Sequence, residues 1–172
     1  MSNQFEKIYY QERDGLRAFL SRKVPFAEVD DLMADVFIAF HERSSKMPIE
    51  NPKAYLYGIA HRLVLKYYER KAKEEGMAQF DSAVHGVNHL GRLSSQIDYK
   101  DRINKVLWGL PIDYQNVFEM RYISKLKIED IVEATGISRA TVNRYLKEVR
   151  KKLEEAFPDL ELPPDKQIED NE

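Results

Sequence analysis

The feature that most constrains the fold is the spacing of apolar residues, which repeats with a helical period along most of the chain. Sustained period-two alternation is absent, and no hairpin dipeptide stands between β-branched runs. The sequence therefore predicts an all-α protein. The clearest stripe, in residues 28–43, consists of Val29, Leu32, Met33, Val36, Phe37 and Phe40.

Two of the breaks between the expected helices are long. Residues 44–52 contain two prolines and predict a loop. Residues 76–97 contain three glycines among scattered polar residues, and they predict a linker that would reach about 70 Å when fully extended. We therefore expect two small helical domains, at residues 1–75 and 98–157, joined by the linker 76–97 and followed by an acidic tail at 158–172. The expected helices cover residues 5–23, 28–43, 53–75, 98–110, 111–122, 128–135 and 138–157.

Composition excludes several classes of protein. The chain has no cysteine, which rules out disulfides, thiolate metal sites and a cysteine nucleophile. No apolar run approaches the roughly 18 to 20 residues of a membrane span, and the N-terminal residues lack the pattern of a signal peptide. We expect a cytoplasmic protein without membrane insertion. There is no P-loop and no carboxylate pair beside a recognisable nucleophile, so neither an enzyme nor a cofactor is expected.

Positive charge is concentrated in two places, although the whole chain carries a formal net charge of −2. Residues 61–73 and residues 138–152 are both rich in Lys and Arg, whereas the tail at 158–172 is strongly acidic. Local basic stripes matter more for a polyanionic partner than the total charge does. The tail is expected to be disordered, and competition with DNA for the second stripe is the alternative.

The second basic stripe lies in a helix, glycine turn, helix pattern. Gly136 supplies the left-handed backbone of a sharp turn, and Ser138 can cap the following helix. Ile131, Ile137 and Val142 fall where the two helices would pack. Arg, Asn and Thr side chains on the outer face suit the edges of bases in the major groove. The same pattern also fits a helical hairpin with a solvated basic face, and the motif alone does not separate the two.

Two longer stretches carry a family resemblance. The stretch LPIDYQNVFEMRYISKLKIEDIVEATGISRATVNRYL, residues 110–146, resembles region four of bacterial sigma factors without gaps. VDDLMADVFIAFHE, followed by NPKAYLYGIAHRLVLKYYERKAK, resembles region two. The order and the small size resemble the extracytoplasmic-function group of the sigma-70 family. The resemblance covers about residues 5–75 and 98–157.

The resemblance implies three binding surfaces. In region two, an acidic helix would dock on core RNA polymerase, and the next helix would bind and open the minus-ten element; Tyr55, also on that helix, is expected to pack in the core. Region four would bind the minus-thirty-five element, with Arg121 in a supporting position that reaches phosphate. The implied residues are Asp31, Leu32 and Asp35 for polymerase; Tyr57, Arg62, Lys66, Arg70 and Lys71 for the minus-ten element; and Ser138, Arg139, Thr141, Asn143, Arg144 and Lys147 for the minus-thirty-five element.

Three positions depart from the family pattern. Ala34 stands where Gln is usual, Val132 where Ala is usual and Lys125 where Gly is frequent. The loss of Gln removes one docking hydrogen bond, and the other two changes affect helix packing. A solvated helix face remains the alternative explanation of Asp31 and Asp35.

The expected function is that of an alternative sigma factor, which binds core RNA polymerase and directs promoter recognition and transcription initiation. Its partners would be the polymerase, promoter DNA and, as is common in this group, an anti-sigma factor. The alternative is a stand-alone helix-turn-helix regulator, and a third possibility is a sigma mimic that sequesters a regulator. A metal site at Asp81, His85 and His89 is disfavoured because no helix or well-spaced ligand set supports it. The sequence does not identify the promoter or the inducing signal.

Overall fold

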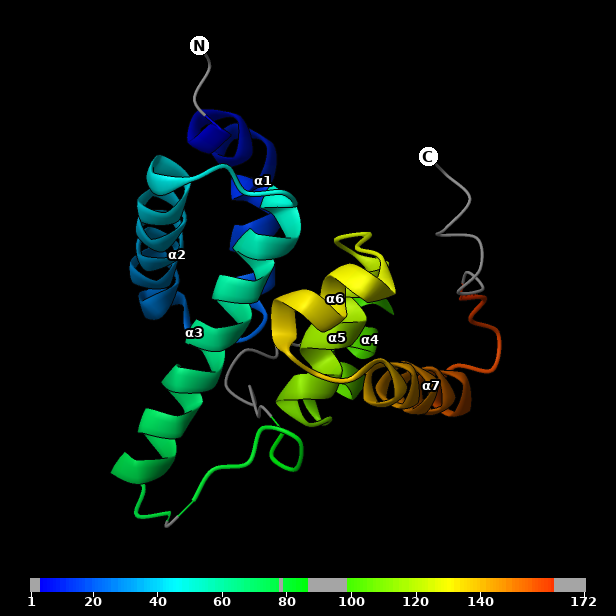
Figure 1. Ribbon diagram of the computed structural model, residues 1–172. Coiled ribbons are helices and arrows are strands. Elements are labelled where there is room, and N and C mark those ends of the chain that lie inside the picture. The colour runs from blue at the N-terminus through cyan, green and yellow to red at the C-terminus, as the bar shows by residue number, and fades with distance from the viewer. Residues whose placement is uncertain (1–3, 78, 87–98, 163–172) are drawn as a thin grey trace. The chain divides into compact units, whose positions relative to one another are not determined.

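A computed structural model describes residues 4–77, 79–86 and 99–162, and within these ranges the regular secondary structure is helical (Figure 1). The predicted all-α class is confirmed. Residues 87–97 of the expected linker and residues 163–172 of the expected acidic tail lie outside these ranges. The helices are α1 (Gln4–Ser21), α2 (Phe26–Lys46), α3 (Pro52–Glu74), α4 (Tyr99–Trp108), α5 (Ile112–Tyr122), α6 (Ile128–Thr135) and α7 (Arg139–Ala156).

The chain divides into two compact units. The first contains residues 1–80 together with 130–136, and the second contains residues 81–129 together with 137–172. Most of α6 is therefore counted with the first unit, while α4, α5 and α7 belong to the second. In the described part of the chain no helix has the length and apolar character that crossing a bilayer requires.

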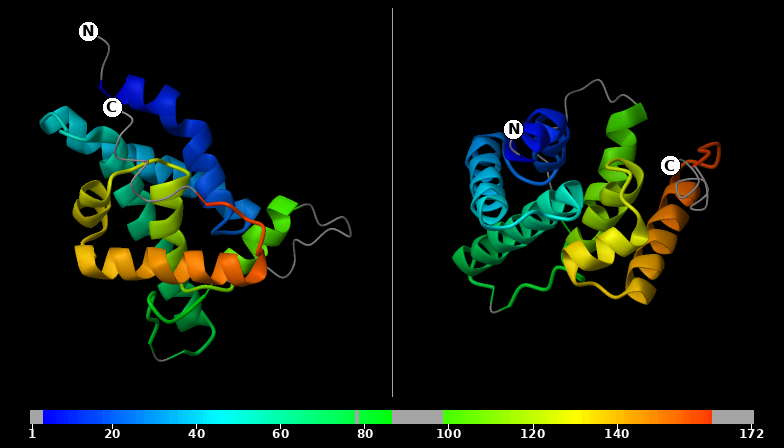
Figure 2. Two further views of the ribbon diagram at one scale, coloured as in Figure 1. Left: turned by 90° about the vertical axis from the view of Figure 1, so that its right-hand side faces the viewer. Right: turned by 45° about the horizontal axis from the view of Figure 1, so that its top comes forward.

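Helices α1, α2 and α3 pack against one another in the first unit, as Figure 2 shows from two further directions. Their apolar stripes meet in a core that includes Leu16, Val36, Phe40 and Leu56, each with no exposed surface. Burial of such side chains supplies most of the stability of a small helical bundle. The predicted stripe on α2 is therefore its core-facing side.

The boundaries of α2 and α3 have local causes. The helix runs past the predicted end at residue 43 and stops at Lys46; Ser44 and Ser45 lie in its last turn, where their hydroxyls donate to main-chain carbonyls three residues earlier. The next helix begins after Asn51, whose side chain accepts a hydrogen bond from the N–H of Ala54 at 3.1 Å. Pro52 occupies the first turn, where its missing N–H costs nothing.

Helix α5 is enclosed in the second unit, where it contacts both α4 and α7. Its buried residues include polar ones, among them Gln115, Glu119 and Arg121, at 1%, 2% and 0% exposure. The guanidinium of Arg121 donates a hydrogen bond to the carbonyl oxygen of Leu126 at 3.1 Å. The supporting role expected for Arg121 fits this geometry, but the expected reach to phosphate was wrong because the side chain is fully buried.

Two backbone positions around α6 have positive φ. Gly136 has φ +75°, as the predicted sharp turn requires. Lys125, in the turn before α6, has φ +60°. This left-handed conformation disfavours side chains with a Cβ, which explains why glycine suits this position better than lysine does.

Candidate nucleic-acid interface

Helix α7 presents one apolar face and one basic face. Val142, Leu146 and Val149 are buried, with at most 1% exposure, so they fix which side of the helix faces the core. The side chains predicted for the minus-thirty-five element lie on the other side or at the helix start. Ser138, Arg139, Asn143, Arg144 and Lys147 are exposed, and Thr141 is half-buried.

The start of α7 is held by its cap. The N–H of Thr141 donates to the hydroxyl of Ser138 at 3.2 Å, and this hydroxyl lies 2.9 Å from that of Thr141. The predicted capping role of Ser138 is confirmed. Next to it, the guanidinium of Arg139 forms an ion pair with Glu129, and the hydrogen bond from Arg139 lowers the pKa of that carboxyl. The first turn of α7 thus has a fixed geometry at its exposed end.

Arg144 lies over an aromatic side chain of the same helix. Its guanidinium carbon is 5.5 Å from the centre of the Tyr145 ring, within the range of a cation–π contact. Tyr145 in turn stacks on Tyr114 of α5, with ring centres 4.0 Å apart. Burial raises the pKa of both phenols, which therefore remain neutral near pH 7. The stacked rings give Arg144 a rigid support at the helix surface.

The second group of cations lies on α3. Arg62, Lys66 and Arg70 are exposed and recur every four residues, so they share one face of the helix. Lys71 is half-buried and lies 3.4 Å from Glu74, an ion pair that partly offsets its charge. Three of the four predicted cations on α3 therefore form one continuous basic stripe.

Tyr57 differs from these cations. Only 2% of its surface is exposed, and its ring lies edge-on to Phe19 of α1, with ring centres 5.6 Å apart. A side chain in this position cannot stack on a DNA base without leaving the core, so its burial favours a packing role. Tyr55, expected to pack, is half-buried and lies at a tilt to Phe40, 6.1 Å between ring centres.

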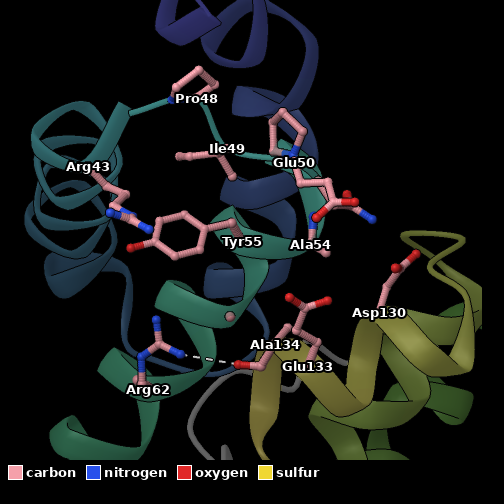
Figure 3. A pocket seen from close by; sticks show the side chains of 13 residues that line it. Arg43, Pro48, Ile49, Glu50, Ala54, Tyr55, Arg62, Asp130, Glu133 and Ala134 are labelled. Atoms are coloured by element: carbon pink, nitrogen blue, oxygen red, sulfur yellow. Dashed lines mark hydrogen bonds between the residues drawn. The ribbon is translucent and has the colours of Figure 1, made fainter. Parts of the chain in front are cut away.

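A hollow of about 680 Å³ lies beside Arg62 in the first unit (Figure 3). The ring of Tyr55 and residues 48–51 form one part of its wall, and Arg43 contributes a second cation. The guanidinium of Arg62 donates to the carbonyl oxygen of Ala134 at 3.1 Å, drawn as a dashed line in Figure 3. A carbonyl carries no net charge, so this contact leaves the charge of Arg62 available to an anion.

His61 lies on α3 next to Arg62, but its side chain is only 2% exposed. Burial lowers its pKa to about 4 from an ordinary value of 6.5, and the charge of Arg62 acts in the same direction. The imidazole is therefore neutral at physiological pH. Because this imidazole is neutral, it adds no buried charge to the core beneath the basic stripe.

The acidic face predicted for polymerase docking lies on α2. Asp31 and Asp35 are exposed and one turn apart, and Leu32 is half-buried. Sequence reasoning missed Ile38, which follows Asp35 by three residues and is 56% exposed. The sequence offered one signal: Ile38 follows Asp35 by three positions and Asp31 by seven, and residues at these spacings share a helix face. The face therefore combines carboxylates with one exposed apolar side chain.

The set-aside metal site finds no support. His85 accepts a hydrogen bond through Nδ1 from the main-chain N–H of Asp81 at 3.1 Å, and His89 lies outside the described residues. Among the residues that the structure describes, no group of three or more potential ligands could hold a metal ion.

Each comparison with known proteins finds a similarity to sigma factors. Residues 100–153 match the family described as Sigma-70, region 4. The ferric citrate uptake sigma factor FecI of Escherichia coli (strain K12) is 23% identical over 145 residues, which cover 83% of this chain and 84% of FecI. The sigma factor RpoE of Bartonella quintana, solved in complex with the anti-sigma factor NepR, has a similar fold. Its TM-score is 0.70 at 19% identity, with 92% of this chain and 99% of that chain covered.

Proposed function

We propose that this chain is an alternative sigma factor of the extracytoplasmic-function group and that its two basic helices bind separate promoter elements. In this proposal residues 1–75 act as region two and residues 98–157 as region four. Sigma factors are not enzymes, and we assign this chain no catalytic activity of its own. Its site of action is the cytoplasm, where polymerase and promoter meet.

The observation that carries the proposal is the outer face of α7. Asn143, Arg144 and Lys147 project from a helix whose opposite side is fixed in a core, as a recognition helix requires. Arg can form two hydrogen bonds to guanine, and Asn can form two to adenine. We propose that these residues, together with Ser138, Arg139 and Thr141, contact the minus-thirty-five element.

The basic stripe on α3 is proposed to bind the opened minus-ten element. Lys66 and Arg70 would follow the phosphates, with Lys71 at the end of the stripe. Arg62 would hold an extruded base at the hollow, where the ring of Tyr55 offers a partly exposed aromatic surface. Stacking is worth roughly 1–3 kcal/mol per base, which helps to offset the cost of unpairing. Tyr57 is left out of this set because it is buried.

Asp31, Leu32 and Asp35 are proposed to dock on core RNA polymerase, with Ile38 adding apolar contact. Exposed carboxylates one turn apart can pair with Arg or Lys of a partner, and charge complementarity speeds association. An anti-sigma factor is a further proposed partner, because the similar RpoE was solved with one.

The proposal is tested by reconstitution with core polymerase. Purified chain should form a complex with the core and start RNA synthesis at promoters that neither component uses alone. Replacing Asp31 and Asp35 by Asn should weaken complex formation, whereas replacing Arg144 by Ala should leave it unchanged and reduce initiation. Replacement of the exposed Glu6 by Gln and of the exposed Asp14 by Asn, both on α1, removes the same charge outside α2 and serves as the control.

The alternative function, a stand-alone regulator, makes the opposite prediction. Such a protein would bind a specific duplex tightly without polymerase and would not associate with the core. If the purified chain binds DNA specifically but never forms a complex with the core, the sigma-factor proposal is refuted.

A further inference from the structure

Arg139, one of the residues proposed to contact the minus-thirty-five element, is already paired with a carboxylate. Its Nη2 donates to a carboxylate oxygen of Glu129, which stands 10 residues earlier in the chain. Both residues belong to the second unit. Arg144 and Lys147, the other cations proposed for this element, form no ion pair with any residue that the structure describes. The positive charge of Arg139 is therefore balanced locally, whereas theirs is not.

The ion pair lies at the protein surface. The side chains of Arg139 and Glu129 are 55% and 58% exposed. The hydrogen bond from Arg139 lowers the pKa of the carboxyl, which therefore stays ionised at neutral pH. Ion pairs this exposed contribute little to folding stability, because water screens the two charges. The consequences of the pair therefore fall mainly on ligands that approach the same surface.

Arg139 stands where a DNA ligand would meet the helix. It is the first residue of α7 and follows the capping residue Ser138 directly. In helix-turn-helix proteins the N-terminal residues of the second helix contact base edges in the major groove. DNA bound in this way would bring both phosphates and base edges within reach of the guanidinium.

Pairing with Glu129 changes what Arg139 can offer to DNA. Attraction between a cation and phosphate is electrostatic and does not depend on sequence. A neutral ion pair gains little from this attraction, and the carboxylate itself repels nearby phosphates. The guanidinium nevertheless keeps hydrogen-bond donors, since the pair occupies Nη2, and Nη1 and Nε make no other hydrogen bond within the described residues. These donors can still reach acceptors on a base, such as O6 and N7 of guanine.

We infer that Glu129 is a specificity-determining residue, which acts through Arg139 by cancelling its attraction to phosphate while leaving its donors for a base edge. The inference rests on the proposed function, in which Arg139 contacts the minus-thirty-five element. Binding to every duplex is weakened by the carboxylate, but a sequence with the matching base recovers part of the loss through hydrogen bonds. Glu129 thus lowers overall affinity and raises discrimination between sequences.

The test uses the full-length chain in complex with core polymerase and a promoter library randomised at the minus-thirty-five element. Glu129→Gln should strengthen binding to the poorest sequences by about threefold or more, because Arg139 then meets phosphate with its full charge. Binding to the best sequences should change by less than about twofold, since their base contact is already made. For the poorest sequences, a plot of log affinity against log salt concentration should steepen by about 1, as expected for one added phosphate contact.

A second comparison shows whether Glu129 acts through Arg139. Arg139→Ala should abolish the preference at one base position, and Glu129→Gln should weaken the preference at that same position. In the Arg139→Ala background, Glu129→Gln should shift all sequences equally and leave the salt dependence unchanged. Glu154→Gln, at an exposed position near the other end of α7, removes the same charge away from Arg139 and should alter no preference. The inference is overturned if Arg139→Ala leaves every preference intact.

The library also separates this inference from the function on which it rests. If the wild-type chain forms no complex with the core, or the complex has no preference within the minus-thirty-five element, the proposed function itself fails. If the wild-type complex discriminates and Glu129→Gln gives the same preferences, or strengthens binding to every sequence equally, only the role of Glu129 is refuted.

Discussion

The buried imidazole of His61 makes the stability of the first unit depend on pH. The folded protein holds this group with a pKa of about 4, below its ordinary value of 6.5. Between these values the unfolded chain binds a proton that the folded chain excludes. The contribution of His61 to the free energy of unfolding is therefore fully present above pH 6.5 and is lost as the pH falls toward 4.

The size of the effect follows from the two pKa values. The difference between a pKa of about 4 in the folded state and 6.5 in the unfolded state corresponds to about 3 kcal/mol of folding stability, which is lost in full at a pH below both values. Between pH 7 and pH 5 the linkage relation gives a loss of about 2 kcal/mol. Glu12 and Asp113 act in the opposite direction, since burial raises the pKa of each carboxyl and acid then favours the folded state. The contribution of His61 must therefore be isolated by comparison with a variant.

The measurement is urea unfolding of the wild-type chain and of His61→Gln at pH 7 and pH 5. Glutamine keeps a polar side chain of similar length but does not titrate. The wild type should lose about 2 kcal/mol more than the variant over this range. NMR titration of the four histidines gives a direct check, with the His61 signal assigned by its absence in the variant. The reasoning is refuted if folded His61 titrates near 6.5, or if both proteins lose stability equally.

Three further predictions concern the second unit. Arg144→Ala should cost about 1–3 kcal/mol of promoter binding and relax preference at one base position; a uniform loss across sequences, in a binding assay on a promoter library, would instead indicate a phosphate contact. Ser138→Ala should lower the free energy of unfolding by about 1 kcal/mol through loss of the cap, as chemical denaturation would measure. Lys125→Gly should raise it by up to about 1 kcal/mol, because glycine adopts φ +60° without strain; an unchanged midpoint would contradict this.

Helical periodicity predicted the fold well, because each apolar stripe has a core to face. The stripes on α2 and α7 are buried as the spacing required, except for Leu32, which is half-buried. Gly136 and Ser138 act at the turn and the cap as predicted, since both are local devices that depend on a few neighbouring residues. The end of α2 was placed too early because Ser44 and Ser45 were read as loop residues, whereas they lie within the helix.

Features that depend on contacts between distant residues were not predictable. The segment 81–86 is an example, because nothing in its sequence indicates that the carbonyls of Ser82 and His85 accept hydrogen bonds from the first turn of α5. Tyr57 is another: helical spacing alone did not distinguish a tyrosine facing α1 from one facing solvent, and the edge-on contact with Phe19 decides it. Ile38 was missed for a different reason: an apolar residue on a helix is normally assigned to the core.

The enclosure of α5 also bears on how proteins of this kind diversify. Its side chains are committed to packing on nearly every side, so most substitutions there disturb the whole unit. Asn143 and Lys147 on α7 are exposed, so exchanging them should alter little of the folding free energy. If this surface reads the promoter as proposed, a lineage can acquire new target genes by changing a few positions on one helix while the scaffold beneath stays the same.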